Sequence, residues 1–337
     1  ATTEIYTLSL HDALPISLVE HEIKLTNDKP VREKLRRISP KVFTLYKQEL
    51  EQMKELGVIE EAKSPYGCNN VLTPKSDGTI RFCTDLRPIN ELTVFDAYPM
   101  PNSEYLLEKL AKAKYISVID ATKGFWQIPI KEKDRDKTAM LTPWGQFRYT
   151  VVPFGGKNSS ATFQRLIDKM LEGCEEFSSA YIDDIAIFSD TWSDHLKHVD
   201  IVLQRVEDAG ITVKPIKCVF GASELVYLGH IVGGGNIKAM PKKTEAVQNW
   251  PTPKTKKQVR AFLGTVGYYK KFVPSYSETA SPLTDLTKKT AANQVQWTDD
   301  CQKAFDKLKQ SFINHLYLQH QIMRKSLLCK LMLVTLV

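Results

Sequence analysis

Apolar residues recur every three or four positions in several stretches of the chain, a spacing that predicts amphipathic helices. Residues 39–57 begin with Ser39-Pro40 and end with Gly57, so an N-cap, a first-turn proline and a glycine stop bracket one apolar face. The same spacing predicts helices over residues 159–173, 196–210 and 259–266. The predicted apolar face of the helix at 196–210 consists of Leu196, Val199, Leu203 and Val206.

Short runs rich in β-branched and aromatic residues predict strands. The runs at 71–73 and 80–83 flank Ser76-Asp77-Gly78, whose Asp-Gly pair predicts a tight hairpin. A second hairpin is predicted around Tyr181-Ile182-Asp183-Asp184, a short polar break in the apolar run 180–188. Because strands, hairpins and helices alternate irregularly, we expect an α+β fold with an antiparallel sheet rather than a doubly wound parallel one.

Two adjacent aspartates at a hairpin tip are the most informative chemical feature of the sequence. Desolvating Asp183 and Asp184 side by side is costly unless a cation neutralises them. Asp120 ends another β-branched run, so its carboxylate can meet the pair at one end of the same sheet. Three such carboxylates suit two hard divalent ions such as Mg²⁺. Taken alone, the pair fits a solvated turn equally well.

Composition narrows the class of protein. With 337 residues, 42% of them hydrophobic, the chain can form two or three domains and is not a disordered polymer. A net charge of +7 favours a polyanionic partner, although charge alone does not identify nucleic acid. The cysteines show neither the spacing of a zinc module nor a disulfide framework, so we expect reduced thiols. They are Cys68, Cys83, Cys174, Cys218, Cys301 and Cys329.

The two ends of the sequence differ in character from the rest. Residues 6–16 look like the translation of a sequencing-adapter oligonucleotide, so we expect residues 1–16 to be a non-native leader. Residues 327–337 are apolar, but Lys330 interrupts them and they fall short of the roughly 20 residues that a membrane span needs. We therefore expect no signal peptide, no transmembrane segment and no membrane partner. Gly233-Gly234-Gly235 and the prolines that follow predict a linker into a second module.

A series of motifs gives the chain a family resemblance. They occur between about residues 19 and 312, at residues 64–66, 75–87, 96–101, 152–155, 161–165, 181–184 and 227–230. In these motifs the chain resembles the reverse transcriptases of gypsy-type LTR retrotransposons, and more distantly those of retroviruses. The resemblance implies a right-hand polymerase whose fingers and palm subdomains, with an antiparallel palm sheet plus helices, occupy residues 17–232. It further implies a smaller thumb- or connection-like α+β module at 233–315, leading toward an RNase H domain that is missing, and a degenerate or frameshifted tail at 316–337.

The resemblance also implies roles for individual residues. Asp120, Asp183 and Asp184 match the catalytic acids that hold two Mg²⁺ ions, with Mn²⁺ as an alternative. The positions that match contacts to the incoming nucleotide are Lys75, Arg81, Phe125, Phe154, Gly155 and Lys217. The positions that match contacts to template and primer are Gln164, Tyr181, Leu228, Gly229 and His230, the last three as a primer grip.

Phe125, Lys75 and Arg81 each have more than one interpretation, whereas Lys217 has one. Phe125 matches a steric gate that excludes a ribose 2′-hydroxyl, but an ordinary core aromatic is the alternative. Lys75 and Arg81 would meet the triphosphate, whereas exposed bases on a hairpin often serve solubility alone. Lys217 matches a lysine near which the leaving pyrophosphate is protonated.

The activity that the resemblance implies is RNA-directed DNA polymerisation, with dNTPs and an RNA or DNA template with its primer as partners. Gly156 stands where the family usually has Leu, and Ser159-Ser160 stand where it usually has Ala-Pro. A catalytically impaired relic that still binds primer-template, or a non-catalytic interaction module, is therefore the alternative. The resemblance implies an intracellular, cytoplasmic location in a virus-like particle, and the sequence leaves the oligomeric state open.

Overall fold

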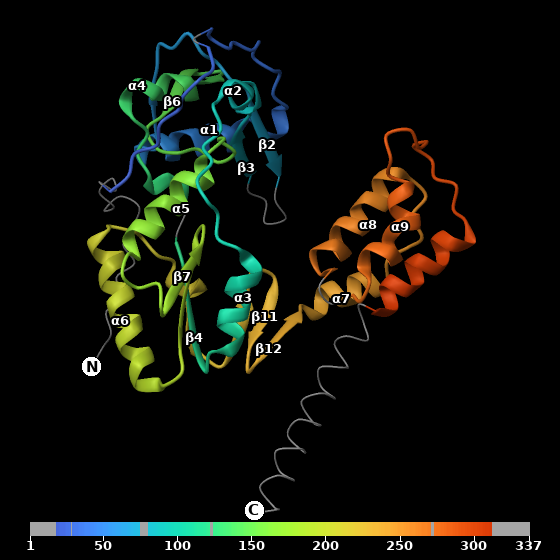
Figure 1. Cartoon of the computed structure of the whole chain (residues 1–337). Coiled ribbons are helices and arrows are strands. Elements are labelled where there is room, and N and C mark those ends of the chain that lie inside the picture. The colour runs from blue at the N-terminus through green and yellow to red at the C-terminus, as the bar shows by residue number, and fades with distance from the viewer. Residues whose placement is uncertain (1–17, 28, 75–79, 122–123, 271–272, 312–337) are drawn as a thin grey trace, which may run out of the picture. The chain divides into compact units, whose positions relative to one another are not determined.

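The chain forms two compact units that divide between Ser223 and Glu224 (Figure 1). The computed structural model describes residues 18–27, 29–74, 80–121, 124–270 and 273–311. The predicted leader at 1–16, the predicted tail at 316–337 and Lys75 lie outside the described residues. Because the division precedes residue 232, the three residues predicted as a primer grip belong to the second unit.

The first unit mixes helices with short antiparallel strands. Its helices and 3-10 turns are α1 (Pro40–Glu55), α2 (Arg87–Leu92), α3 (Ser103–Lys112), η1 (Gly124–Gln127), α4 (Glu132–Arg135), η2 (Asp136–Thr138), α5 (Ser159–Met170), α6 (Trp192–Asp208) and η3 (Pro215–Lys217). Its strands are β1 (Ile59–Glu61), β2 (Asn70–Pro74), β3 (Ile80–Thr84), β4 (Tyr115–Asp120), β5 (Met140–Thr142), β6 (Gly145–Tyr149), β7 (Ser178–Tyr181), β8 (Asp184–Ser189) and β9 (Val219–Ala222).

A four-stranded antiparallel sheet, ordered β7-β8-β4-β9, forms the lower part of this unit in Figure 1. Ile119 and Ile185 face each other across β4 and β8 and are fully buried in the core that includes α5 and α6. Helix α3 contacts β8 through the other face, where Lys109 stands over the Phe188 ring. Covering both faces explains why the middle of β8 reads Ile185-Ala186-Ile187-Phe188 without a polar residue.

The upper part of the first unit contains α1 and two smaller antiparallel sheets, β2-β3 and β1-β6-β5. The predicted helix at 39–57 is confirmed: Tyr46, Leu50 and Met53 form its buried face, and Gly57 ends it with a φ of +67°. The predicted hairpin is confirmed as the pair β2 and β3, with Thr73 opposite Arg81. The turn of this hairpin lies outside the described residues.

Helix α6 exists where the apolar spacing predicted a helix, but the predicted face is wrong at two positions. Leu196 is 53% exposed and Leu203 is 38% exposed, whereas His195, Val202 and Val206 are buried. The polar His195 occupies a core position because its ring nitrogens bond the hydroxyls of Ser117 and Ser189 at 2.8 and 3.0 Å. A hydrophobicity count alone could not identify a histidine that is satisfied inside the core.

The second unit joins a small antiparallel sheet to a helical cluster. Its named elements are β10 (Glu224–Tyr227), β11 (His230–Gly233), β12 (Asn236–Ala239), α7 (Pro241–Gln248), α8 (Lys256–Tyr268) and α9 (Tyr276–Asp285), and residues 299–311 are also helical. Val259, Phe262 and Val266 of α8 are fully buried, which confirms the predicted helix at 259–266. The core of this unit is built around them.

The glycine triplet predicted as a linker is instead part of a hairpin. Gly233 pairs with Asn236 at the end of β11 and β12, and Gly234 and Gly235 form the turn with φ values of +58° and +78°. A two-residue turn with both φ angles positive requires residues such as glycine. The prediction of a linker at these glycines is therefore wrong.

The cysteines and the apolarity of the helices bear on two further predictions. The cysteines at positions 68, 83, 174, 218 and 301 are free thiols, and Cys329 lies outside the described residues. Among the helices that the structure describes, none combines the length and apolarity needed to cross a bilayer.

Candidate active site

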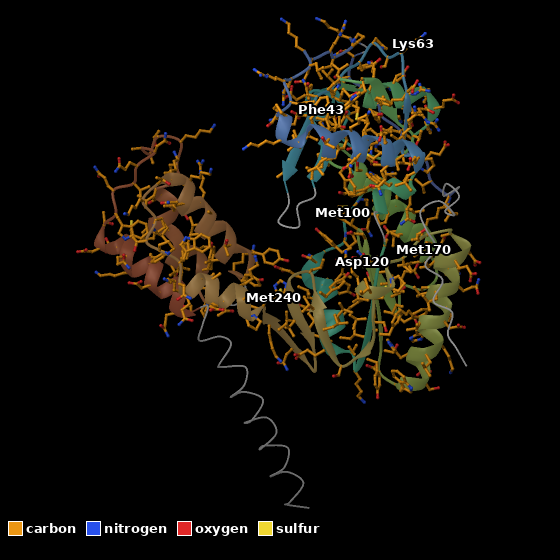
Figure 2. The ribbon with its side chains drawn as sticks, turned by 180° about the vertical axis from the view of Figure 1, so that it is seen from behind. Phe43, Lys63, Met100, Asp120, Met170 and Met240 are labelled. Atoms are coloured by element: carbon orange, nitrogen blue, oxygen red, sulfur yellow. The ribbon has the colours of Figure 1, made fainter. Side chains whose placement is uncertain are left out.

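The structure brings Asp120, Asp183 and Asp184 to one end of the four-stranded sheet, and we call this end the acidic edge. Asp120 ends β4 and Asp184 begins β8, and the two residues are direct antiparallel partners. Side chains of such partners point to the same face of the sheet. Asp183 lies in the turn between β7 and β8, and the amide of Ala121 donates to its carbonyl oxygen at 3.1 Å. Figure 2 labels Asp120 at this position.

The turn that carries Asp183 has an unusual backbone. Tyr181 pairs with Asp184, so only Ile182 and Asp183 connect the strands, and Ile182 has a φ of +57°. A β-branched residue in the left-handed region is a rare outlier that the surrounding structure has to hold in place. The left-handed Ile182 therefore marks a strained tip at the acidic edge.

Gln164 of α5 holds this tip. Its side-chain oxygen accepts from the Ile182 amide at 2.8 Å, and its nitrogen donates to the Ala180 carbonyl at 3.2 Å and to Asp168 at 2.8 Å. Gln164 is 0% exposed, so it does not face solvent as a template-primer contact would. Gln164 therefore supports the hairpin in this structure, and the template-primer contact predicted for it stays a prediction.

Charge at the acidic edge is unevenly distributed. Both carboxylate oxygens of Asp120 accept from the Lys217 ammonium, at 3.2 and 2.9 Å, and this hydrogen bond raises the pKa of Lys217. Burial, followed by the charges of Asp183 and Asp120, raises the pKa of Asp184 to about 6 against the opposing effect of Lys217. In the described ranges no set of three or more His, Cys, Asp or Glu side chains is already arranged to hold a metal ion.

Phe125, which follows Asp120 closely in the sequence, belongs to a group of three phenylalanine rings. The half-buried Phe125 ring makes edge contacts with Phe154 and Phe163, with 5.7 Å between ring centroids in each case. Phe163 is fully buried, while Phe154 is exposed, and Gly155 follows it with a φ of +84°. Phe125 is therefore supported by a core residue, Phe163, while its side chain stays partly exposed.

The remaining predicted residues are distributed over the two units. Arg81 lies in β3, and its side chain is outside the described part of the structure. Leu228 and Gly229 form the turn between β10 and β11 of the second unit, and His230 begins β11. The half-buried Tyr181 ends β7 next to the acidic turn.

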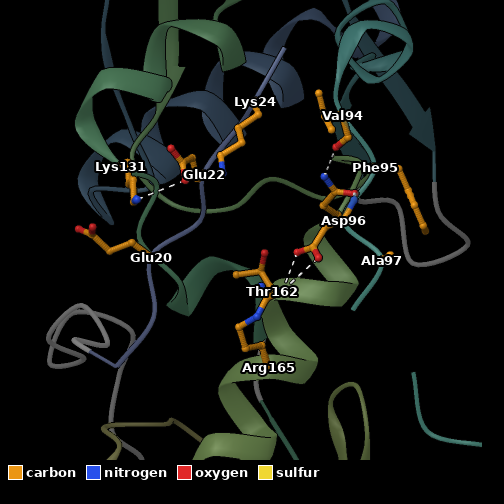
Figure 3. Close-up of a pocket in the computed structure, with 11 residues that line it drawn as sticks. Glu20, Glu22, Lys24, Val94, Phe95, Asp96, Ala97, Lys131, Thr162 and Arg165 are labelled. Carbon is orange, nitrogen blue, oxygen red and sulfur yellow. Dashed lines mark hydrogen bonds and ion pairs between the residues drawn. The ribbon is translucent and has the colours of Figure 1, made fainter. Parts of the chain in front are cut away.

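Sequence reasoning missed how the segment around Asp96 is fastened to α5. Arg165 donates to both oxygens of Asp96, at 2.8 and 3.1 Å, and Tyr98 donates its hydroxyl to Asp168 at 2.8 Å. Figure 3 shows Asp96 and Arg165 pointing toward each other in a hollow of about 450 Å³. Asp168 also accepts a hydrogen bond from Gln164, so Tyr98 is linked through Asp168 to the residue that holds the acidic hairpin. Asp96 and Arg165 both lie in motifs noted in the sequence, at 96–101 and 161–165, but nothing in the sequence showed that the two motifs pair.

The chain matches known proteins over most of its length. Residues 73–232 match the family described as "Reverse transcriptase (RNA-dependent DNA polymerase)". The Pol polyprotein from transposon 297 of Drosophila melanogaster is 35% identical over 307 residues, across 89% of this chain and 29% of that protein. The Pol polyprotein from transposon gypsy of the same species is 34% identical, across 82% of this chain and 28% of that protein. The chain thus spans less than a third of these relatives.

Solved structures agree with the sequence matches. A foamy viral protease-reverse transcriptase in complex with double-stranded DNA has a TM-score of 0.80 and 26% identity, across 88% of this chain and 52% of that one. The same viral protein with an RNA/DNA hybrid gives a TM-score of 0.78. Residues 73–232 therefore form a reverse transcriptase domain similar to those of LTR retrotransposon Pol polyproteins, and the chain has the α+β polymerase fold that its motifs predicted.

Proposed function

We propose that the chain is an RNA-directed DNA polymerase that adds deoxynucleotides to the 3′-hydroxyl of a primer. The observation that carries this proposal is the direct opposition of Asp120 and Asp184 across β4 and β8, with Asp183 in the adjoining turn. A solvated turn would not need a strained backbone with a buried glutamine beneath it. The strained backbone at Ile182 supports the view that this turn serves to position the carboxylates.

Asp120, Asp183 and Asp184 would hold two Mg²⁺ or Mn²⁺ ions. The raised pKa of Asp184 supports this fit, because carboxylates that repel one another gain from a neighbouring cation. Bound divalent ions would supply a lower pKa for the primer hydroxyl and charge neutralisation at the triphosphate. Asp120 takes part once its ion pair with Lys217 opens, which would leave the ammonium free to donate a proton to pyrophosphate.

Other residues would bind and select the nucleotide. Phe125, supported by Phe163, would stand where a ribose 2′-hydroxyl would have to fit. Lys75 and Arg81 would contact the triphosphate, and Phe154 with Gly155 would lie against the nucleotide. Tyr181 would face the primer-template, and the turn from Leu228 to His230 would position the primer end.

The partners in this proposal are a template, its primer and dNTPs. The foamy viral relative was solved with double-stranded DNA and with an RNA/DNA hybrid, which supports a nucleic-acid partner. Residues 17–232 would provide fingers and palm, and residues 233–315 a thumb-like module.

Incorporation of labelled dTTP on poly(rA) primed with oligo(dT) tests the proposal. We expect incorporation of dTTP to require Mg²⁺ or Mn²⁺. We expect UTP to be incorporated poorly compared with dTTP. Tight binding of the primer-template without incorporation in the presence of either Mg²⁺ or Mn²⁺ would contradict the proposal. The chain would then be a primer-template binding protein without turnover.

A primer-template binding protein without turnover is the second candidate, favoured by an observation beside Phe154. A Cβ atom built at Gly156 would lie 2.8 Å from the Ser159 hydroxyl, which is buried and has no hydrogen-bond partner among the described residues. Gly156 and Ser159 are two of the positions that depart from the family pattern. A residue with a Cβ at 156, such as the Leu usual in the family, would need a change at 159 as well, so both departures alter the segment beside Phe154 where the nucleotide is expected to bind.

A further inference from the structure

The turn between β10 and β11 has a backbone that needs support. Tyr227 pairs with His230, so the turn consists of Leu228 and Gly229, with φ values of +43° and +69°. Glycine adopts this left-handed conformation readily, but leucine does so at a cost in free energy because its Cβ crowds the backbone. Some other part of the unit has to stabilise the conformation of Leu228.

Two consecutive tyrosines at the C-terminal end of α8 supply such support. The Tyr268 hydroxyl donates to the Leu228 carbonyl at 2.6 Å, and the Tyr269 hydroxyl donates to the Gly229 carbonyl at 2.9 Å. The two carbonyls are those of the two turn residues. We refer to Tyr268 and Tyr269 as the tyrosine pair.

His230 adds a ring contact to each member of the tyrosine pair. Its ring centroid lies 5.2 Å from that of Tyr268 and 5.0 Å from that of Tyr269, and the two tyrosine rings meet edge to face at 5.0 Å. A ring nitrogen of His230 also lies 2.9 Å from the Leu228 carbonyl oxygen. Three aromatic side chains therefore surround one turn.

We propose that Tyr268 and Tyr269 are positioning residues that fix the β10–β11 turn to α8 and thereby fix the primer end. This inference rests on the proposed function, in which Leu228, Gly229 and His230 form the primer grip. Helix α8 is anchored in the core of the second unit by Val259, Phe262 and Val266. The turn consequently shifts only together with this helix, which couples the position of the primer end to the position of the helical module.

The two tyrosines differ in a way that separates hydrogen bonding from packing. Tyr268 is 55% exposed, so its ring contributes little buried area and its hydroxyl carries most of its effect. Tyr269 is buried, so its ring also packs in the core. Tyr276 provides a matched control, because its hydroxyl donates at 3.3 Å to the Leu263 carbonyl of α8 rather than to a carbonyl of the turn.

Amide hydrogen exchange on the full chain without nucleic acid tests the support directly. We expect exchange at Tyr227 and His230 to become about fivefold faster in Tyr268→Phe and about thirtyfold faster in the double variant with Tyr269→Phe. Tyr276→Phe should leave these two amides unchanged. Unchanged exchange in the double variant would overturn the proposal.

A rescue variant distinguishes a role in the turn from general stability. Leu228→Gly removes the strain, so adding it to the double variant should restore most of the slow exchange at His230. Failure of this rescue would mean that the tyrosine pair only packs α8, and the proposal would be wrong.

Primer extension then tests the consequence for the reaction. We expect the double variant to extend a bound primer about tenfold more slowly, with primer-template affinity changed less than about twofold, and Tyr276→Phe to behave as the parent chain. Equal loss of affinity and rate would contradict a positioning role. If the parent chain extends no primer, the proposed function fails, while the exchange measurements still decide whether the tyrosine pair holds the turn.

Discussion

Gln164→Met tests whether the acidic hairpin is positioned by a buried hydrogen-bond network. Methionine matches glutamine in length and removes the three bonds to Ile182, Ala180 and Asp168. Each bond contributes about 1 kcal/mol net, and a buried group left without a partner costs about 1–3 kcal/mol. We expect the free energy of unfolding to fall by about 2–4 kcal/mol.

The same substitution should slow catalysis more than it weakens nucleic-acid binding. Without the bond to its amide, the strained Ile182 can relax and displace Asp183, and a misplacement of about 1 Å is worth about a hundredfold in rate. Urea unfolding measures the stability, and single-turnover primer extension at a temperature where both proteins are folded measures the rate. We expect the rate to fall by about 10- to 100-fold while the primer-template Kd changes less than about threefold.

Gln204→Met is the matched control for this experiment. Gln204 lies on the exposed surface of α6 and donates to Asp208 four residues on, as Gln164 donates to Asp168. We expect this control to change neither stability nor rate appreciably. A parent-like rate in folded Gln164→Met would refute the positioning argument, and a rate loss matched by an equal loss of affinity would instead support a direct contact with the template-primer.

Three further predictions follow from individual residues. Burial lowers the pKa of His21 to about 4, so the unfolded chain takes up its proton first; stability should fall by up to about 3 kcal/mol as the pH drops from about 6.5 to 4, and His21→Gln should flatten that part of the urea-unfolding profile. Ser159→Ala removes a buried hydroxyl that lacks a partner among the described residues and should raise the unfolding free energy by about 1 kcal/mol; a loss of stability would show that the hydroxyl is satisfied. Phe125→Ala should raise incorporation of rNTPs relative to dNTPs, and an unchanged ratio would make Phe125 a core residue only.

Local patterns predicted the elements and the acidic edge well. The polar break between two apolar runs became the two-residue turn at Ile182-Asp183, and the strand before Asp120 pairs with β8 in the register that opposes Asp120 to Asp184. Both predictions used the alternation and β-propensity of neighbouring residues, which act over a few positions.

The supporting contacts could not be predicted, because they join residues distant in sequence. Gln164 and Ile182 meet only after α5 packs on the sheet, and the tyrosine pair meets Leu228 across 40 positions of chain. Single side chains of this kind carry no periodic signal. The same limit explains His195, whose place in the core depends on hydroxyls from two different strands.

The most direct test of the account compares Asp183→Asn with Asp190→Asn in single-turnover primer extension on an RNA template. Asp190 is an exposed aspartate that follows the last residue of β8, at the opposite end from Asp184, so its variant controls for the loss of one surface charge. We expect Asp183→Asn to lower the rate by at least about a thousandfold with nearly unchanged primer-template binding, because the acid acts through bound metal ions worth several kcal/mol. Asp190→Asn should extend primers as the parent chain does. Equal rates for the two variants would contradict the assignment of the acidic edge as the catalytic centre.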